Sequence, residues 1–182
     1  MRSKFFDSFL DELEARVEIE DTIKRFVRGV DRQDWELARS TYHGDAIDEH
    51  GFFTGGRDEF LAFIARMHET QEHSMHVISN VLIDFTARDK AIVETYCLVF
   101  HRFGASAEGV APGSHGIRRF ATSRYIDKFE ARGGEWRVAH RTLVFSEMQT
   151  EQVTTPVVFP PTFVVQKHNM DDALYRIRAA AG

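Results

Sequence analysis

The spacing of apolar residues changes once along the chain and divides it into a helical first part and a strand-rich second part. Apolar side chains in the first third recur every three or four residues, as on one face of a helix. Asp34 fits as the N-cap of the second helix, because its carboxylate can accept a bond from the first free amides. Three helices are expected, over residues 19–30, 35–42 and 57–70. An earlier helical turn or two, from about residue 9, precedes the first helix or belongs to it.

From about residue 75 the apolar repeat shortens towards two, which is typical of strands rich in Val, Ile, Phe, Tyr and Thr. The links at residues 87–90 and 132–134 are short enough for hairpins, whereas residues 104–116 form a longer link. Helices followed by such a meander indicate an α+β fold, with the helices on one side of a curved, mostly antiparallel sheet. Strands are expected at residues 46–53, 75–85, 91–103, 117–129 and 135–145.

Size and composition favour a single domain over residues 1–182. The chain has 182 residues, of which 43% are hydrophobic, and this is enough for one sizeable core. Residues 150–182 form a C-terminal tail that opens with an apolar stretch at residues 157–161 and ends in a helix from Asp171. We expect this tail to close a pocket or to contact a neighbouring subunit.

Charge and cysteine content exclude several classes of partner. The formal net charge of −5, with no cluster of basic residues, disfavours a nucleic-acid partner. The single cysteine, Cys97, excludes an internal disulfide and a Cys-rich zinc site, and it fits a reducing cytoplasm. No stretch approaches the roughly 18 apolar residues of a membrane span, and the start of the chain lacks the apolar run of a signal peptide. We therefore expect a cytoplasmic protein without a membrane partner.

Nine histidines and sixteen phenylalanines suggest titratable chemistry in an aromatic interior. Asp31 directly follows the apolar stripe of the first helix, where it is either an ordinary polar residue or a carboxylate that orients a histidine. His76 enters the first long strand, and His101 shares one face of the next strand with apolar neighbours, so its ring needs a partner. His68 and His73 precede His76, but no carboxylate is placed with them, and we expect no metal site.

Four short motifs follow one another along residues 10 to 150. They are V-D-x-x-D-W after the first helix, H-x-x-x-N at the first long strand, V-F-H-R-F on the second and G-x-W-x-x-x-x-R on the last. In this order they resemble the SnoaL-like, scytalone dehydratase-like branch of the nuclear transport factor 2-like (NTF2-like) superfamily. The resemblance implies a cone-shaped fold in which helices and a curved sheet enclose a deep pocket. Such folds host dehydratases, dehydrochlorinases, cyclases, isomerases and non-catalytic subunits.

The resemblance also implies roles for single residues. Asp31 and His76 fall on the aspartate and the catalytic histidine that scytalone dehydratase and hexachlorocyclohexane dehydrochlorinase share. His101 falls on a second pocket histidine of the dehydratase, which the dehydrochlorinase lacks. Ser123 matches a polar pocket position of the dehydratase. The resemblance therefore implies Asp31, His76 and His101 as catalytic residues, with Ser123 binding substrate.

Other positions depart from the family pattern and point away from scytalone as the substrate. The two pocket tyrosines of the dehydratase fall on Val30 and Glu49, and its pocket asparagine falls on Tyr125. Glu49 and Tyr125, if they face the pocket, would shape it for a different substrate, and Glu49 on a strand can equally be solvated. Asn80 of the strand motif and Phe103 complete the candidate substrate-binding set.

Two further sets of residues have simpler expectations. Arg119 and Arg124 lie an odd number of residues apart on one strand, so they point to opposite faces and at most one lines the pocket. Five phenylalanines are expected mainly in the core, with a minority lining a pocket: Phe100, Phe103, Phe120, Phe129 and Phe145.

The two matched enzymes both carry out elimination, in which a base removes a proton from carbon while a neighbouring group leaves. We therefore expect a cofactor-independent lyase for a small hydroxylated aromatic or cyclic substrate, acting by dehydration or by carbon–carbon cleavage that releases formaldehyde. One alternative is a cyclase or isomerase with the same residues. Another is a non-catalytic ligand-binding module or the small subunit of a ring-hydroxylating oxygenase. The apolar tail favours a homo-oligomer, a dimer or trimer.

Overall fold

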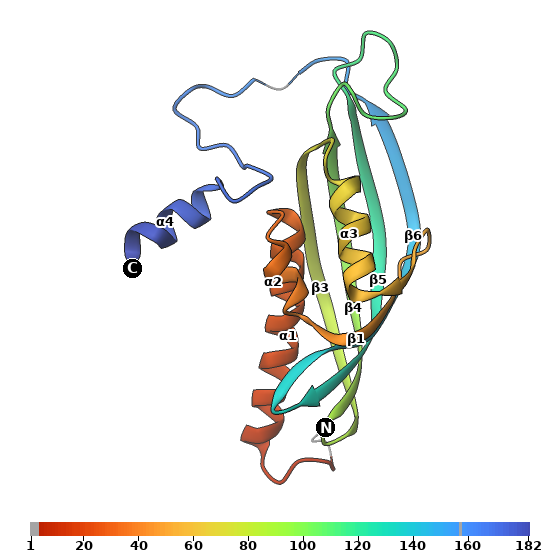
Figure 1. Cartoon of the computed structure of the whole chain (residues 1–182), viewed down its shortest axis with the longest axis vertical. Helices are drawn as coiled ribbons and strands as arrows, with labels where there is room; N and C mark the ends of the chain where they lie inside the picture. The colour runs from red at the N-terminus through yellow and green to blue at the C-terminus, as the bar shows by residue number, and fades with distance from the viewer. Residues whose placement is uncertain (1–3, 157) are drawn as a thin grey trace.

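A long, bent sheet with helices on one side makes up the body of the molecule (Figure 1). The computed structural model describes residues 4–156 and 158–182, so the expected apolar stretch 157–161 lies partly outside the described residues. The observed architecture confirms the expected α+β class with a curved, open sheet. In chain order the elements are α1 (Phe9–Asp31), α2 (Trp35–Arg39), β1 (Tyr42–Glu49), β2 (Thr54–Gly56), α3 (Arg57–Met67), β3 (Gln71–Ala87), β4 (Lys90–Phe103), β5 (Ile117–Arg132), β6 (Glu135–Gln152) and α4 (Ala173–Ala181).

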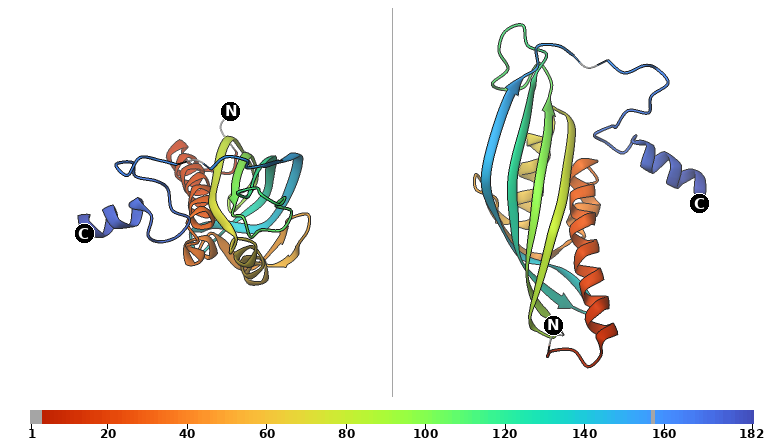
Figure 2. Two further views of the ribbon diagram at one scale, coloured as in Figure 1. Left: turned by 90° about the horizontal axis from the view of Figure 1, so that it is seen from above. Right: turned by 180° about the vertical axis from the view of Figure 1, so that it is seen from behind.

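The six strands are ordered β2-β1-β6-β5-β4-β3. Strands β3 to β6 form an antiparallel meander, while β1 runs parallel to β6 and antiparallel to β2. Seen from above and from behind, α1 and α3 lie on one side of the meander and the other side carries no helix (Figure 2). We call the helix-covered side the inner face and the other side the outer face. Side chains alternate between the two faces along each strand.

Helix α1 begins with a capping box and ends close to the site described below. The Ser8 hydroxyl accepts the amide of Asp11 at 3.1 Å, while the Asp11 carboxylate accepts the amide of Ser8 at 3.3 Å. The apolar stripe expected from the sequence is buried, with Ile19 and Ile23 at 0% exposure. A Cβ at Gly29 would lie 2.7 Å from the Ala38 amide nitrogen, so only glycine lets α2 pack this closely against the end of α1. This packing fixes the position of Asp31.

Several expected boundaries are wrong by a few residues. Helix α2 stops at Arg39, where the hydroxyls of Ser40 and Thr41 donate to the carbonyls of the preceding turn. The strand expected at residues 46–53 is replaced by β1, which starts and ends four residues earlier, at 42 and 49, and by the short β2. Helix α3 ends at Met67 rather than at residue 70, and β3 begins at once with Gln71. The expected C-terminal helix is present, with Asp172 as its N-cap.

The expectation that the five phenylalanines lie mainly in the core is also wrong. Phe103 and Phe129 are buried. Phe100 and Phe120 stand on the outer face, with ring centroids 5.0 Å apart, because their even positions alternate with inner-face residues. Phe145 is on the inner face but 42% exposed at its open edge.

The deepest part of the core contains an ion pair surrounded by rings. Arg141 and Asp127 have 0% side-chain exposure and form two hydrogen bonds, from Nε at 2.8 Å and from Nη2 at 2.7 Å. The guanidinium carbon lies 4.0 Å from the ring centroid of Tyr125 and 4.3 Å from that of Phe26. This end of the inner face is closed.

Candidate active site

Asp31 and His76 meet at the other end of the inner face, where α1 ends against β3. The Asp31 carboxylate accepts three hydrogen bonds, from His76 Nδ1 at 2.7 Å, from the Ser74 hydroxyl at 2.7 Å and from the His76 amide at 2.9 Å. Both side chains of the pair are 10% exposed. The sequence places these residues 45 positions apart, and the fold brings them into direct contact.

The environment of Asp31 keeps its carboxylate ionised. Burial raises the pKa of Asp31, but the charge and hydrogen bonds of His76 and the hydroxyl of Ser74 outweigh this and lower the pKa to about 2. An ionised carboxylate only accepts hydrogen bonds, so Nδ1 of His76 carries the proton. In the neutral ring Nε2 then holds a free lone pair. This is the tautomer that a general base needs.

A second histidine stands beside this pair on the inner face. His101 lies directly opposite Ser74 in the register of β3 and β4, and its ring centroid is 5.7 Å from that of His76. Burial, followed by the positive charges of His76 and His68, lowers the pKa of His101 well below its ordinary value. The ring is therefore neutral at pH 7. Its Nε2 is buried and has no hydrogen-bond partner among the described residues, which leaves it available to a ligand.

The C-terminal tail reaches the same site through His168. Nδ1 of His168 donates to the main-chain oxygen of Asp31 at 2.8 Å, and Nε2 lies 3.2 Å from Nδ1 of His68. Because Nε2 of a neutral His168 can only accept, His68 donates from Nδ1 and exposes a lone pair at Nε2. Burial lowers the pKa of His68 to about 3, with the positive charge of His168 as the next cause. A chain of neutral rings thus connects the tail to the dyad.

Three further contacts hold the tail in place. Gln166 donates to the carbonyl of Ser74 at 2.8 Å, and the Tyr175 hydroxyl donates to the Asp34 carboxylate at 3.0 Å. Asp172 lies 3.6 Å from Nε of Arg32, at the end of α1. The segment from 166 to 175, which we call the clasp, is therefore bound to residues that flank the dyad. Before the clasp, residues 158–165 of the tail arch away from the body (Figure 1).

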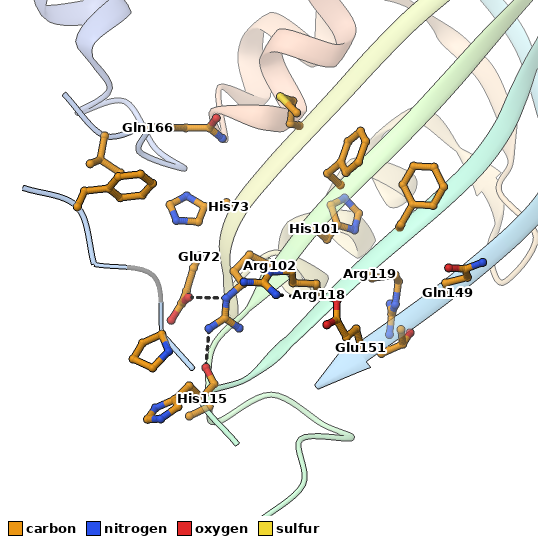
Figure 3. A pocket seen from close by; sticks show the side chains of 18 residues that line it. Glu72, His73, His101, Arg102, His115, Arg118, Arg119, Gln149, Glu151 and Gln166 are labelled. Atoms are coloured by element: carbon orange, nitrogen blue, oxygen red, sulfur yellow. Dashed lines mark hydrogen bonds and ion pairs between the residues drawn. The ribbon is translucent and has the colours of Figure 1, made fainter. Parts of the chain in front are cut away.

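A pocket of about 1020 Å³ lies at the same end of the sheet, between the strands and the tail (Figure 3). His101 and Arg119, which are paired on neighbouring strands, are among its lining residues. The tail contributes Phe159 and Gln166 to the wall. Most of the strand residues in the lining belong to the outer face, including Met75, Phe100, Arg118 and Phe120, and Asp31 and His76 are not among the lining residues.

The structure brings most of the expected site residues to one region. Asp31, His76 and His101 lie together, and the ring of Phe103 contacts His101 edge to face at 5.8 Å. Ser123 is on the inner face two rows of the sheet further in, where its hydroxyl donates to the Cys97 carbonyl at 3.3 Å.

The structure places three expected substrate-binding residues away from the dyad. Glu49 accepts the hydroxyl of Thr142 on the outer face, because the register of β1 on β6 turns it away from the helices. Asn80 is exposed at a bulge of β3, with φ of 42°. Tyr125 is buried in the core beneath Arg141, with its hydroxyl 3.6 Å from the Cys97 sulfur.

Sequence reasoning missed two histidines of the site. In the sequence, His68 suggests only a metal ligand, and no pattern marks His168. Among the described residues, no group of three or more His, Cys, Asp or Glu side chains is arranged to hold a metal ion. Within residues 4–156 and 158–182, no helix has both the length and the apolar character to cross a bilayer. Cytoplasmic location and the lack of a nucleic-acid partner stay predictions.

The arrangement of helices, sheet and buried dyad can be compared with known proteins. The model of the SnoaL-like domain family matches residues 11–142. The chain belongs to this family. This membership confirms the resemblance seen in the sequence motifs. No curated protein sequence matches the chain.

Solved structures share the fold of this SnoaL-like protein at low sequence identity. Hexachlorocyclohexane dehydrochlorinase from Novosphingobium barchaimii LL02 is 20% identical, with a TM-score of 0.71 over 85% of this chain and 100% of that chain. A scytalone dehydratase candidate from Novosphingobium aromaticivorans is 20% identical, with a TM-score of 0.66 over 86% and 99%. A candidate aromatic ring hydroxylase from Novosphingobium aromaticivorans is 17% identical, with a TM-score of 0.64 over 78% and 94%.

Proposed function

We propose that this protein is a cofactor-independent lyase in which Asp31 and His76 form a base dyad. The observation that carries the proposal is the 2.7 Å hydrogen bond from His76 Nδ1 to Asp31, which leaves Nε2 free to take a proton. General-base catalysis by such a ring contributes about 10²–10⁴-fold to a rate. Two of the three neighbours named above are called a dehydrochlorinase and a scytalone dehydratase candidate, and both names denote elimination, which is consistent with this chemistry.

In a dehydration, His76 Nε2 takes a proton from a substrate carbon. The electrons of the C–H bond form a C=C bond as the neighbouring C–O bond breaks, and the departing hydroxide takes up the proton held by His76 as water. Asp31 stabilises the imidazolium between these steps. His101, which is neutral, acts by donating a hydrogen bond to the departing oxygen rather than as a cationic acid.

Release of formaldehyde uses the same base on a different proton. His76 would take the proton of a hydroxymethyl O–H group, and a C=O bond would form as the adjacent C–C bond breaks. The electrons of that C–C bond would form the new C=C bond and expel a hydroxide from the next carbon, and this hydroxide would take up the proton held by His76 and leave as water. Both versions suit a small hydroxylated aromatic or cyclic substrate, and the products distinguish them.

The test is turnover of a panel of hydroxylated aromatic compounds, followed by mass spectrometry for loss of water and by a formaldehyde assay. His76→Ala should lower kcat/KM by about 10²–10⁴-fold while circular dichroism and Tm stay close to those of the original chain. His140→Ala, on the outer face near Glu49, is the matched control and should keep full activity. Unchanged turnover in His76→Ala would refute the proposal.

Two alternatives give different results in the same assay. A product of unchanged mass, lost in His76→Ala, would indicate a cyclase or isomerase with the same dyad. Tight ligand binding without any turnover would indicate a binding module, and co-purification with a large iron-containing partner would indicate an oxygenase subunit. The three polar groups gathered inside an apolar face favour catalysis over both non-catalytic roles.

We also propose that the chain forms a dimer or trimer through the outer face. Apolar side chains of β3 and β4 are exposed there, and contiguous patches of this kind commonly mark interaction sites. Replacing Leu98 with Lys should shift the mass measured by light scattering towards that of one chain. The exposed side chains outside the pocket include Val77, Tyr96 and Leu98.

A further inference from the structure

Arg119 stands next to the proposed acid–base residues and is not used by the mechanism above. In the register of β4 and β5 it lies directly opposite His101, which places it on the inner face in the same row as Ser74. Figure 3 shows Arg119 and His101 along neighbouring strands at the pocket. The guanidinium carbon of Arg119 lies 5.0 Å from the ring centroid of Phe103, which is a cation–π contact.

This guanidinium has no counter-ion, unlike its neighbours. Arg102 lies 3.6 Å from Glu72, and Arg118 lies 3.9 Å from Glu151. Among the described residues no carboxylate comes within 4.0 Å of Arg119, and its Nε is buried without a hydrogen-bond partner. The two other pocket arginines are therefore neutralised by the protein, and Arg119 is not.

An unpaired, half-buried guanidinium is costly unless something else completes it. Arginine keeps its charge at every relevant pH, and its planar fork of donors fits a carboxylate in a bidentate arrangement. Removing such a charge from water without a partner destabilises the protein. Arg119 lies directly opposite His101 on the neighbouring strand. An anion that arrives with the substrate best explains why an unpaired guanidinium is present there despite its destabilising effect.

We propose that Arg119 binds a carboxylate of the substrate, so that the natural substrate is a hydroxylated aromatic acid rather than a neutral ring compound. This inference rests on the proposed function and narrows its substrate class. With the carboxylate held at Arg119 and the ring against Phe103, the rest of the molecule extends along the row towards His101 and His76. Arg119 is then the specificity-determining residue of the site.

The test measures binding, so that it does not depend on turnover. 4-Hydroxycinnamate, 4-hydroxybenzoate and their methyl esters are titrated by calorimetry into the full chain and into Arg119→Met. The acids should bind about 10- to 100-fold more tightly than the esters, the range expected for one charge-assisted contact. Arg119→Met should remove this preference and leave ester binding unchanged.

Arg124→Met is the matched control, because Arg124 lies on the same strand but pairs with Glu94 on the outer face. It should keep the full preference for acids, as should His76→Ala. Acids that bind no better than their esters, or not at all, would overturn the inference, as would an equal loss of preference in Arg124→Met. Because His76→Ala tests the base by turnover and Arg119→Met tests the substrate class by affinity, the two proposals fail separately.

Discussion

Two carboxylates lie on the inner side of the sheet, one at each end of it. Each of them accepts hydrogen bonds from a basic side chain. At the closed end, Asp127 receives two bonds from Arg141, and both side chains are fully buried. At the open end, Asp31 accepts a hydrogen bond from one ring nitrogen of His76, and both side chains are 10% exposed. The first pair has a permanently charged cation enclosed by rings. The second has a titratable ring with one nitrogen left free.

This difference separates a structural role from a chemical one. The side chain of Arg141 has 0% exposure and lies between the rings of Phe26 and Tyr125, and the nearby Asp127 carboxylate raises its pKa against the effect of burial, so it keeps its proton. His76 is fixed by Asp31 through Nδ1, and the neutral ring of His101 lies beside it, with the two ring centroids 5.7 Å apart. A buried acid–base contact alone therefore does not indicate a site; a buried contact with an unused proton-accepting atom does.

The largest expected effect is a loss of activity when Asp31 is changed. Asp31→Asn keeps the shape of the side chain but removes the charge that stabilises the imidazolium and selects the tautomer. We expect kcat/KM to fall by about 10²–10⁴-fold. Urea unfolding of the same variant provides the control, and it should show a cooperative transition. Activity within a factor of about two of the original would contradict the assignment.

The counterpart at the closed end is Arg141→Met, which leaves the Asp127 carboxylate buried without its cation. Breaking a buried pair in this way costs about 3–5 kcal/mol of unfolding free energy. Urea denaturation measures the loss, and the activity of the molecules that remain folded should be nearly unchanged. A loss of activity without a loss of stability would show that Arg141 belongs to the site.

The next effect is the pH dependence of the free energy of unfolding, and the lowered pKa of His68 sets its direction. His68 has a folded-state pKa of about 3, below its ordinary value near 6.5, so the unfolded chain binds more protons between these pH values. Stability is therefore lost as pH falls through this window, by up to about 1.4 kcal/mol per pH unit for each such ring. For Asp31 the window is lower, since its stabilising effect is lost as pH falls from 3.8 towards about 2.

His68→Asn tests this window, because the amide can still donate to His168. Between pH 6.5 and 5 the original chain should lose roughly 2 kcal/mol more than the variant, as measured by urea unfolding. Parallel pH dependence of the two proteins would show that His68 is not buried in the neutral form.

The smallest expected effect lies in the clasp. Tyr175→Phe removes the hydrogen bond to Asp34, which is worth about 0.5–1.5 kcal/mol. The loss should appear as faster proteolysis of residues 158–175 with little change in overall Tm. His140→Ala, on the outer face of β6 near Glu49, serves as the control, and its tail should be cut at the original rate. Equal cutting of Tyr175→Phe and the original chain would show that this contact does not hold the tail.

Much of the fold follows from spacing, because the apolar stripe of α1 and the period of two in β3 to β6 are strong signals. The same period correctly places Arg119 and Arg124 on opposite faces. It also explains the errors, since Phe100 and Phe120 occupy outer positions that a count of phenylalanines ignores. The predicted orientations of Asn80 and Glu49 depend on strand register, because a bulge or a shifted strand start turns a side chain to the other face of the sheet.

The site was only partly accessible from the sequence. The contact between Asp31 and His76 came from the family resemblance, because no local pattern connects residues 45 positions apart. His168 contacts Asp31 across 137 positions from a tail without periodicity, and no pattern could have revealed it. The unpaired state of Arg119 became visible only when the partners of neighbouring arginines were known.

The most direct test of the dyad is the tautomer of His76, read from ¹⁵N and ¹H shifts of its ring at pH 8. We expect a protonated Nδ1 in a strong hydrogen bond and an unprotonated Nε2, and Asp31→Asn should abolish this preference. A ring that carries its proton on Nε2 in the original chain would contradict the account, because no base would then face the substrate.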